Sequence, residues 1–438
     1  AETHYISGRK LKGPFPDQMA VAVFGFVFFL GAERKFLSEN GDELSRKTTR
    51  GLTLILGGIA ALGAAGIDMY LPSLPTIEME LAGEPGVSQL TLSAFFVGLA
   101  VGQLIYGPAS DALGRRKVLI WGIILYCFGG LACLFVETIE QLIFARLIQA
   151  LGAAAGGVIT RAIVRDLFSL DKAAQAQSFI NLAFSITPLL APTIGGYLLV
   201  LFGWRSIFLA LLCFGLVCLI ALVLRVPETL PFERRKTFSL MSLMTGYRRI
   251  LGNRQSMGCI FTGAFAFACM FTYFAASPFI FIKIFEVPEE RYGLLFGLNV
   301  IGIIIGNIIN TRLVLRKGAL VMLRVGSIIS ALGGLSLFIA IANNLFGIYG
   351  VIIPLFFVIG SLGFIGANAI AGALEPFPDL AGTTASLFGF LQMMLGAFVG
   401  GLVSLLHDGT ALPMAVIIVL LSFMSLSSCI VFLWLRKV

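Results

Sequence analysis

Two charged residues lie inside long apolar stretches of the 438-residue chain, where ionisable groups are costly to place. Asp68 is the one acidic residue well within such a stretch, directly before the segment LPSLP. A carboxylate balanced between burial and a nearby cation can exchange a proton for a bound molecule. Arg146 keeps its own proton but can hold a carboxylate in its ionised form. Alternatively, Asp68 lies at a wet helix end and Arg146 extends outward to the surface.

A second group of charges is concentrated in the stretch GPASDALGRRK, residues 107–117. Its glycines allow tight turns, and its aspartate could reach a neighbouring helix start near Thr383 or a basic partner. Anchoring at a membrane surface would explain the cations alone, but not the carboxylate and the glycines. The residues that we expect to act together are Gly107, Asp111, Gly114, Arg115 and Arg116.

Two further patterns concern helix shape and apolar binding. In APTIGG, Pro192 removes a backbone donor and bends a helix, while Gly195 and Gly196 permit close packing. This element is either a hinge or a kink without functional consequence. Aromatic residues crowd a later stretch, and we expect Tyr273 and Phe274, together with Tyr70, to line an apolar pocket.

The composition requires that membrane-spanning helices position these residues. Hydrophobic residues make up 58% of the chain and charged residues 12%, about half of the roughly 25% that is typical of soluble domains. About 20 apolar residues cross a bilayer as a helix, and such unbroken runs exclude the alternating strands of a barrel. Twelve stretches qualify: 51–71, 88–107, 118–136, 139–160, 175–200, 204–225, 255–281, 291–311, 319–341, 345–372, 382–406 and 411–435.

The net charge of +8 points to a membrane surface rather than to nucleic acid, because the basic residues alternate along the chain. If the cluster at Arg46, Lys47 and Arg50 is cytoplasmic, the connections on the same side hold most of the other cations. The opposite connections are acidic or neutral apart from Arg205, Lys283 and Arg291. Both ends of the twelve-helix core are therefore expected in the cytoplasm.

The two halves of the chain repeat each other. A shift of 204 residues pairs Gly98 with Gly302, Gly102 with Gly306 and Gly114 with Gly318, and a shift of 203 pairs Tyr70 with Tyr273 and Pro75 with Pro278. Parallel repeats are typical of transporters that bind substrate between their halves. We therefore expect a six-helix half at 51–225, a cytoplasmic linker at 226–254 and a six-helix half at 255–438. Residues 1–50 form an extension of unknown role, whose apolar run 19–32 is short for a crossing.

These motifs resemble those of a known family. The stretch 107–117 resembles the G-x-x-x-D-x-x-G-R-R/K motif of the major facilitator superfamily. The segments IDMYLPSLP, QLTLSAFFVGLAVGQLIYGP, MFTYFAASPFIFI and EPFPDLAGTTASL are similar to the bicyclomycin-resistance (Bcr/CflA) branch of drug–proton antiporters. The similarity covers about residues 50 to 438. It implies an all-α membrane protein whose twelve transmembrane helices form two six-helix, pseudo-symmetric halves.

The resemblance also implies roles for the residues above. It places Asp68 at the central cavity and gives Arg146 a part in proton coupling, although Ala150 replaces the glycine of the R-x-x-Q-G motif. APTIGG resembles the G-P-x-x-G-G element of exporters, with Ala191 in place of the first glycine, which implies a hinge against the eighth helix.

The expected function is export of small drug-like molecules in exchange for protons, by alternating access across a bacterial inner membrane. An exporter of amino acids or siderophore-like metabolites is the alternative within this class, and a membrane-embedded enzyme or sensor is the alternative outside it. No nucleophile–base pair, metal cluster or phosphate-binding loop is visible, so we expect no enzyme, no metal and no cofactor. The remaining energy source is the proton gradient, and the protein is expected to be a monomer.

Overall fold

The computed structural model describes residues 43–82, 85–168, 170–235 and 240–434. The chain divides into two units, residues 1–48 and residues 49–438, and the candidate functional residues all belong to the second. The apolar run at 19–32 lies outside the described residues.

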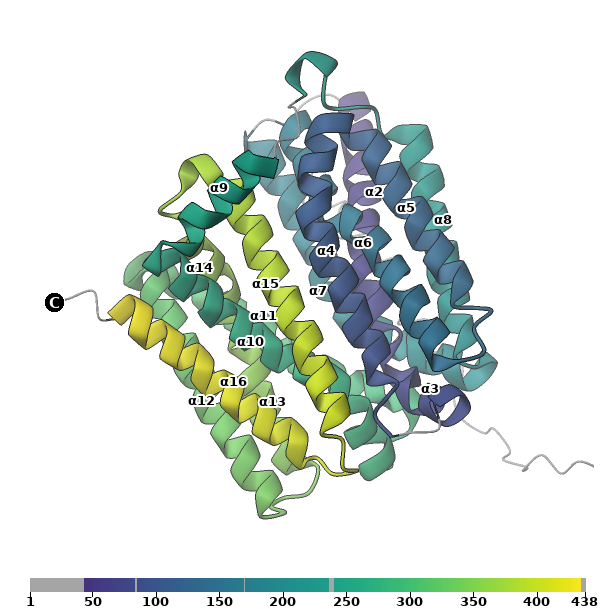
Figure 1. Ribbon diagram of the computed structural model, residues 1–438, viewed down its shortest axis with the longest axis vertical. Coiled ribbons are helices and arrows are strands. Elements are labelled where there is room, and N and C mark those ends of the chain that lie inside the picture. Colours follow the sequence, from purple (N-terminus) through teal and green to yellow (C-terminus); the bar gives the residue numbers. More distant parts are fainter. Residues whose placement is uncertain (1–42, 83–84, 169, 236–239, 435–438) are drawn as a thin grey trace, which may run out of the picture. The chain divides into compact units, whose positions relative to one another are not determined.

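The second unit is built from helices (Figure 1). Its first half contains residues 49–68 of α2 (Glu43–Asp68), followed by η1 (Leu71–Ser73), α3 (Leu74–Ile77), η2 (Glu78–Ala82), α4 (Gln89–Leu113), α5 (Arg115–Ala132), α6 (Ile139–Leu167), α7 (Leu170–Phe202) and α8 (Arg205–Arg225). A connection with η3 (Phe232–Arg234) and α9 (Leu240–Leu251) follows. The second half contains α10 (Arg254–Pro278), η4 (Phe279–Ile284), α11 (Glu289–Lys317), α12 (Ala319–Ala342), α13 (Tyr349–Gly360), α14 (Leu362–Leu374), η5 (Pro378–Leu380), α15 (Ala381–Leu405), α16 (Leu412–Cys429) and η6 (Ile430–Trp434).

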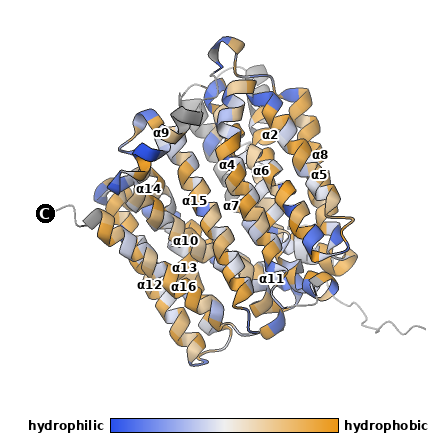
Figure 2. Cartoon of the chain, viewed as in Figure 1, coloured by the Kyte–Doolittle hydropathy of each residue, from blue (hydrophilic) through white to orange (hydrophobic). Residues whose placement is uncertain are grey.

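Ten spans in the described part of the chain are long and apolar enough to cross a membrane. The other two expected positions are occupied by α5, which begins with three basic residues, and by α7, whose apolar part is Ile186–Phe202. Figure 2 shows apolar residues along most of the length of the helices. Helix α8 exposes several of them, including Val217 and Ile220. Such a surface suits lipid rather than water.

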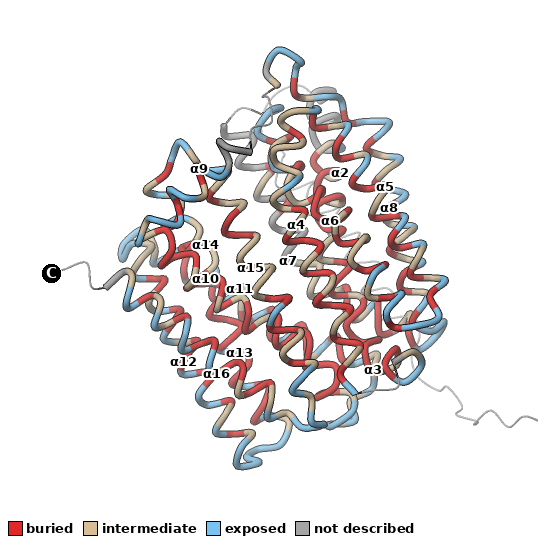
Figure 3. Tube along the Cα trace, viewed as in Figure 1, coloured by how far each residue is buried: buried red, intermediate tan, exposed pale blue. Residues whose placement is uncertain are grey.

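The helices differ in how far they are buried (Figure 3). In the span Arg254–Ile284, 78% of an 18-residue apolar stretch is buried, against 33% in Arg205–Arg225. The first of these spans therefore lies at the centre of its bundle and the second at its edge. The residues of the candidate site belong to the buried helices.

Two helix pairs join the halves. Helix α4 packs on α15, where Gln103 lies against Gly389, and α7 packs on α11, where Thr193 lies against Gly293. In Figure 1, α4 and α15 run side by side. The pairs are the second with the eleventh span and the fifth with the eighth. The second and eighth spans are counterparts in the two halves, and so are the fifth and eleventh. Exchanging each span for its counterpart therefore converts one pair into the other, as expected for two homologous halves.

The helices have two ends that differ in charge. We use "basic end" for the end that carries Arg115, Arg254 and Lys317, and "acidic end" for the end that carries Glu78 and Glu289. Helix starts and stops alternate between these ends along the chain, so each connection belongs to one of them.

The predicted connection between the second and third spans is wrong. The stretch 107–117 is not a loop: α4 continues through Pro108 to Leu113, and Gly114 alone forms the turn into α5. The backbone angle φ of Gly114 is +103°, a conformation that favours glycine. The tenth span is divided at Ser361 into α13 and α14, where Gly360 packs against Gly302 of α11.

Candidate functional site

Asp68 is the last residue of α2, where two prolines interrupt the span. Pro72 and Pro75 have no N–H group to donate, and the chain continues as the short helices η1 and α3. The Asp68 side chain is only 2% exposed. No hydrogen bond or ion pair from another described residue reaches its carboxylate. The segment that follows it, η1, packs on α7 of the first half and on α10 and α11 of the second. Asp68 therefore lies buried at the junction of the two halves.

Arg146 of α6 is fully buried inside the first half. Its Nη2 donates to the carbonyl oxygen of Gly66 at 2.8 Å, and its Nη1 donates to Oε1 of Gln149 at 2.7 Å. The guanidinium carbon is 4.5 Å from the ring centre of Tyr70 and 4.1 Å from that of Phe95. Cation–π contacts of this kind partly compensate a buried charge.

The structure does not pair Arg146 with Asp68 through a hydrogen bond or ion pair within the described residues. Helix geometry gives the reason: Arg146 binds the carbonyl of Gly66, and a residue two positions further along a helix points to a different face. The last carbonyls of a helix have no intrahelical donor. Arg146 supplies one to Gly66 and so fixes the end of α2 that presents Asp68. This is a positioning role, not direct contact with the carboxylate.

Replacing Arg146 with Lys should reduce transport by roughly tenfold, because one ammonium group cannot reproduce the planar fork that binds Gly66 and Gln149 and stacks on the rings. The measurement is transport at matched protein amounts, together with the pH profile of substrate-induced proton release. Arg165→Lys on the same helix is the control, since that side chain is 74% exposed. Unchanged transport and pH profile in Arg146→Lys would exclude the positioning role.

The APTIGG element brings α7 against both halves. A Cβ added to Gly196 would lie 2.5 Å from the carbonyl oxygen of Glu289 in α11, as expected for packing against the eighth span. Gly195 differs from the prediction, because it faces the first span: an added Cβ would overlap the carbonyl oxygen of Met69. Pro192 is buried within α7, which continues to Phe202. The two glycines thus connect the residue after Asp68 with the start of α11.

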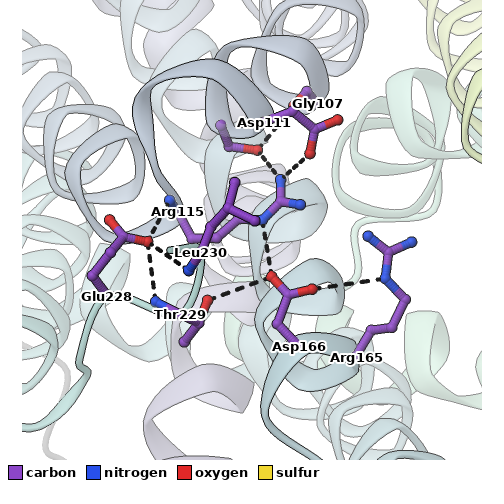
Figure 4. Close-up of polar contacts among 9 residues, drawn as sticks. Gly107, Asp111, Arg115, Arg165, Asp166, Glu228, Thr229 and Leu230 are labelled. Carbon is purple, nitrogen blue, oxygen red and sulfur yellow. Dashed lines mark hydrogen bonds and ion pairs between the residues drawn. The ribbon is translucent and has the colours of Figure 1, made fainter. Parts of the chain in front are cut away.

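The residues of the 107–117 stretch form a polar network at the basic end (Figure 4). Arg115 is 4% exposed and binds Asp111 at 2.6 Å and Asp166 of α6 at 3.1 Å. Within the described residues, no hydrogen bond or ion pair joins Asp111 to the start of the eleventh span, where Thr383 lies against Gly246 of α9. Asp111 pairs with Arg115 because α4 is helical to Leu113, which leaves a single-residue turn between their helices.

Two acidic residues of this network were missed in the sequence. Asp166 ties α6 to Arg115, and Glu228 Oε1 accepts hydrogen bonds from the N–H groups of Arg115, Thr229 and Leu230. Glu228 therefore satisfies a free N–H group at the start of α5, where a negative charge is favourable. Both are acidic residues among basic ones, and this exception to the charge pattern could have revealed them.

The remaining predicted residues lie elsewhere. Gly107 has nothing within 4 Å of an added Cβ, and Arg116 Nη2 donates to the carbonyl of Val223 at the edge of the network. The predicted pocket residues are packed within the helices of their own halves. Tyr70 bonds to Thr91 at 2.6 Å, and Tyr273 bonds to Asn299 at 3.0 Å. Phe274 contacts Phe296 with ring centres 5.2 Å apart, so none of the three is open to a cavity here.

Asp111→Asn should lower transport about two- to tenfold while membrane insertion stays normal, because a part-exposed ion pair contributes only about 1 kcal/mol and Arg115 keeps Asp166. Turnover per inserted protein is the quantity to measure. Arg165→Gln is the control, because that cation is 3.9 Å from Asp166 and exposed. Normal turnover in Asp111→Asn would mean that the charged residues of this network serve only to anchor the helix ends at the membrane surface.

Comparison with known proteins places this arrangement in a family. Residues 54–401 match the family model described as Major Facilitator Superfamily. The Bicyclomycin resistance protein homolog of Haemophilus influenzae is 33% identical over 369 residues, which cover 84% of this chain and 92% of that protein. Multidrug resistance protein D of Escherichia coli is 29% identical over 354 residues, covering 80% and 87%.

The fold is also shared with a solved structure. A partially occluded inward open conformation of the xylose transporter XylE from E. coli matches with a TM-score of 0.68 and 15% sequence identity, covering 90% of this chain and 98% of that one. The family match spans both halves and includes the networks around Asp68 and Arg115. The chain therefore belongs to the major facilitator superfamily.

Proposed function

We propose that this protein exports drug-like organic molecules in exchange for protons. The observation that carries the proposal is Asp68, a buried carboxylate that no hydrogen bond or ion pair from another described residue reaches. It lies at the end of α2, directly before η1, which packs on α7 and α11. The cost of burying an unpaired charge is removed when the carboxylate binds a proton. The names of the relatives, which include a Chloramphenicol resistance protein of Pseudomonas aeruginosa, support a drug as the substrate.

In the proposed cycle, the basic end faces the cytoplasm, as the positive-inside rule predicts, and the membrane is the bacterial inner membrane. Both ends of the twelve-helix core are then cytoplasmic. From the cytoplasm, Asp68 releases a proton and the protein loads a neutral or cationic molecule. From outside, protonation of Asp68 expels it. The proton gradient is the energy source, so that a monomer works without a cofactor.

Contacts in the described residues support a conformation that is closed at the acidic end. Polar contacts join the halves there, including Thr76 to Glu289 at 3.4 Å. Near the basic end the packing is looser: a Cβ added to Gly107 of α4 or to Gly382 of α15 would have no other atom within 4 Å among the described residues. The substrate would therefore enter from the cytoplasmic side in this state.

A susceptibility panel tests the proposal. An efflux-deficient bacterial host would be grown with and without the protein against bicyclomycin, chloramphenicol and chemically diverse antibiotics, and against inhibitory amino acids as metabolite probes. Protection should extend to at least one antibiotic and disappear when an uncoupler collapses the proton gradient. Protection against the amino acids alone would favour a metabolite exporter. No protection against any compound, in cells that contain the inserted protein, would contradict the proposal.

A further inference from the structure

The acidic end contains a buried carboxylate that the proton-coupling scheme does not use. Glu78, the first residue of η2, is 5% exposed. Its Oε2 accepts hydrogen bonds from the Gly86 N–H group at 2.7 Å and from Oγ of Ser88 at 3.2 Å. Its Oε1 faces Nζ of Lys283 at 3.3 Å. Because Lys283 belongs to η4, this ion pair joins the first half to the second.

The same carboxylate is connected to a second segment of the other half through Gly86. The carbonyl oxygen of Gly86 accepts a hydrogen bond from Oγ of Ser404, near the end of α15, at 2.7 Å. Gly86 has a φ of +86°, and a Cβ there would lie 2.8 Å from the Ser404 carbonyl oxygen. The close approach therefore requires glycine. Glu78 holds Gly86 by its N–H group while Ser404 holds it by its carbonyl.

The two carboxylate oxygens of Glu78 have partners in different halves, and this determines which bonds break when the acidic end opens. Gly86 and Ser88 belong to the same half as Glu78, so these bonds can persist when the halves separate. Lys283 is 39% exposed and its Nζ is 5.3 Å from the centre of the Phe279 ring, which belongs to its own half. Among the contacts of Glu78 and Gly86, separation thus breaks one ion pair and one hydrogen bond, and it leaves the Glu78 and Lys283 charges with partners or water. Such a contact is specific yet reversible.

We propose that Glu78 and Lys283 form the latch that keeps the acidic end closed, with Gly86 and Ser404 as its second contact. The latch sets how often the protein opens toward the acidic side, and so it is a determinant of the release step rather than of proton coupling. This inference rests on the alternating access of the proposed function, but not on the identity of the substrate or on Asp68.

An amide cannot replace the Glu78 carboxylate. Glutamine has one acceptor oxygen, and if that oxygen binds the Gly86 N–H group, its NH2 group faces the Lys283 ammonium. In the opposite orientation the NH2 group faces the Gly86 N–H donor. Glu78→Gln therefore loses one side of the latch in either orientation. Lys283→Gln removes the cation, whereas Lys283→Arg retains it.

The test measures opening directly, with a reporter cysteine between the halves. Ser93 of α4 is 8% exposed and lies against Gly400 of α15, so Ser93→Cys should react slowly with a membrane-impermeant maleimide while the acidic end is closed. The native cysteines provide a background that is measured in the protein without the reporter. Glu78→Gln and Lys283→Gln should each raise the labelling rate at least about threefold, since the open population grows when the closed state loses an ion pair. Lys283→Arg should label like the parent.

Glu80→Gln is the matched control. Glu80 is also acidic and in η2, but its partners Trp204 and Arg205 belong to its own half, so that its loss should leave the labelling rate unchanged. All variants are compared at equal yield and after gel filtration, which separates misfolded protein. An unchanged rate in both Glu78→Gln and Lys283→Gln, or an equal rise in Glu80→Gln, would overturn the latch. Failure of the drug panel with an intact labelling response would refute the substrate class alone.

Discussion

Asp68→Asn is expected to abolish proton-driven export while the protein still inserts and folds. Asparagine has nearly the shape of a protonated aspartate, but it can neither bind nor release a proton. Because Asp68 is 2% exposed at the junction of the halves, the neutral side chain should be tolerated there. The variant should therefore still exchange substrate down its own gradient. Drug uptake into everted vesicles, with and without a proton gradient, separates the two activities.

Asp408→Asn is the control for this substitution. Asp408 lies between α15 and α16 in the connection at the acidic end, and hydrogen bonds from the Thr410 hydroxyl and N–H groups lower its pKa below the ordinary value. It is consequently ionised across the pH range in which transport is measured, and its removal should leave gradient-driven uptake unchanged. Gradient-driven uptake by Asp68→Asn at the parental rate would show that a residue other than Asp68 couples transport to protons.

Gly195→Ala should stop transport almost completely, even though it adds a single methyl group. The new Cβ would overlap the carbonyl oxygen of Met69, and backbone atoms cannot move aside as a flexible side chain can. Overpacking of this kind typically costs about 1–3 kcal/mol, and here it displaces α7 from the residue that follows Asp68. Transport at matched protein amounts measures the effect, and thermal stability in detergent shows how much of it arises from folding.

Gly401→Ala is the matched control for Gly195→Ala. Gly401 also lies within a membrane-spanning helix, α15, but nothing lies within 4 Å of an added Cβ there. We expect transport close to that of the parent. Full activity in Gly195→Ala would mean that α7 does not approach Met69 during transport, and the role of the two glycines in coupling the halves would have to be abandoned.

The helices could be predicted from the sequence because lipid imposes a strong and local requirement. Each crossing needs a run of apolar residues, and the chain has little polarity outside its connections. The glycine and proline spacing revealed the repeat, and the helix pairs α4 with α15 and α7 with α11 follow from it. The end of α4 was misplaced because Pro108 and the polar residues after it look like a loop, although the helix continues past them to Leu113.

The contacts of the candidate site were less predictable, since they depend on residues that are distant in the chain. Arg146 was expected to take part in proton coupling, but the sequence could not show which group it binds. In the structure Arg146 of α6 binds the carbonyl of Gly66, two residues before Asp68 on α2. Gly195 and Gly196 are adjacent in the sequence, yet one meets the first span and the other meets the eighth. The rotation of a helix about its own axis decides which neighbour each of its residues contacts. When residues on all sides of a helix are apolar, the hydrophobic pattern does not determine that rotation.

Glu228 and Glu78 illustrate a second reason. The charge pattern could have drawn attention to Glu228 as an acidic residue among basic ones, but the neighbouring sequence does not identify the distant donor that binds either carboxylate. Glu228 reaches the start of α5, 113 residues earlier in the chain, and Glu78 faces Lys283, 205 residues later. Only the folded arrangement brings these partners together.

Drug-induced proton release is the measurement that tests the central claim most directly. Purified protein in detergent and weak buffer would receive a compound from the susceptibility panel, while a pH indicator records protons released. If drug and proton compete at Asp68, the parent should release protons in a saturable manner that depends on the starting pH, and Asp68→Asn should release none. Equal proton release by Asp68→Asn and the parent would contradict the assignment of Asp68 as the residue that couples drug export to protons.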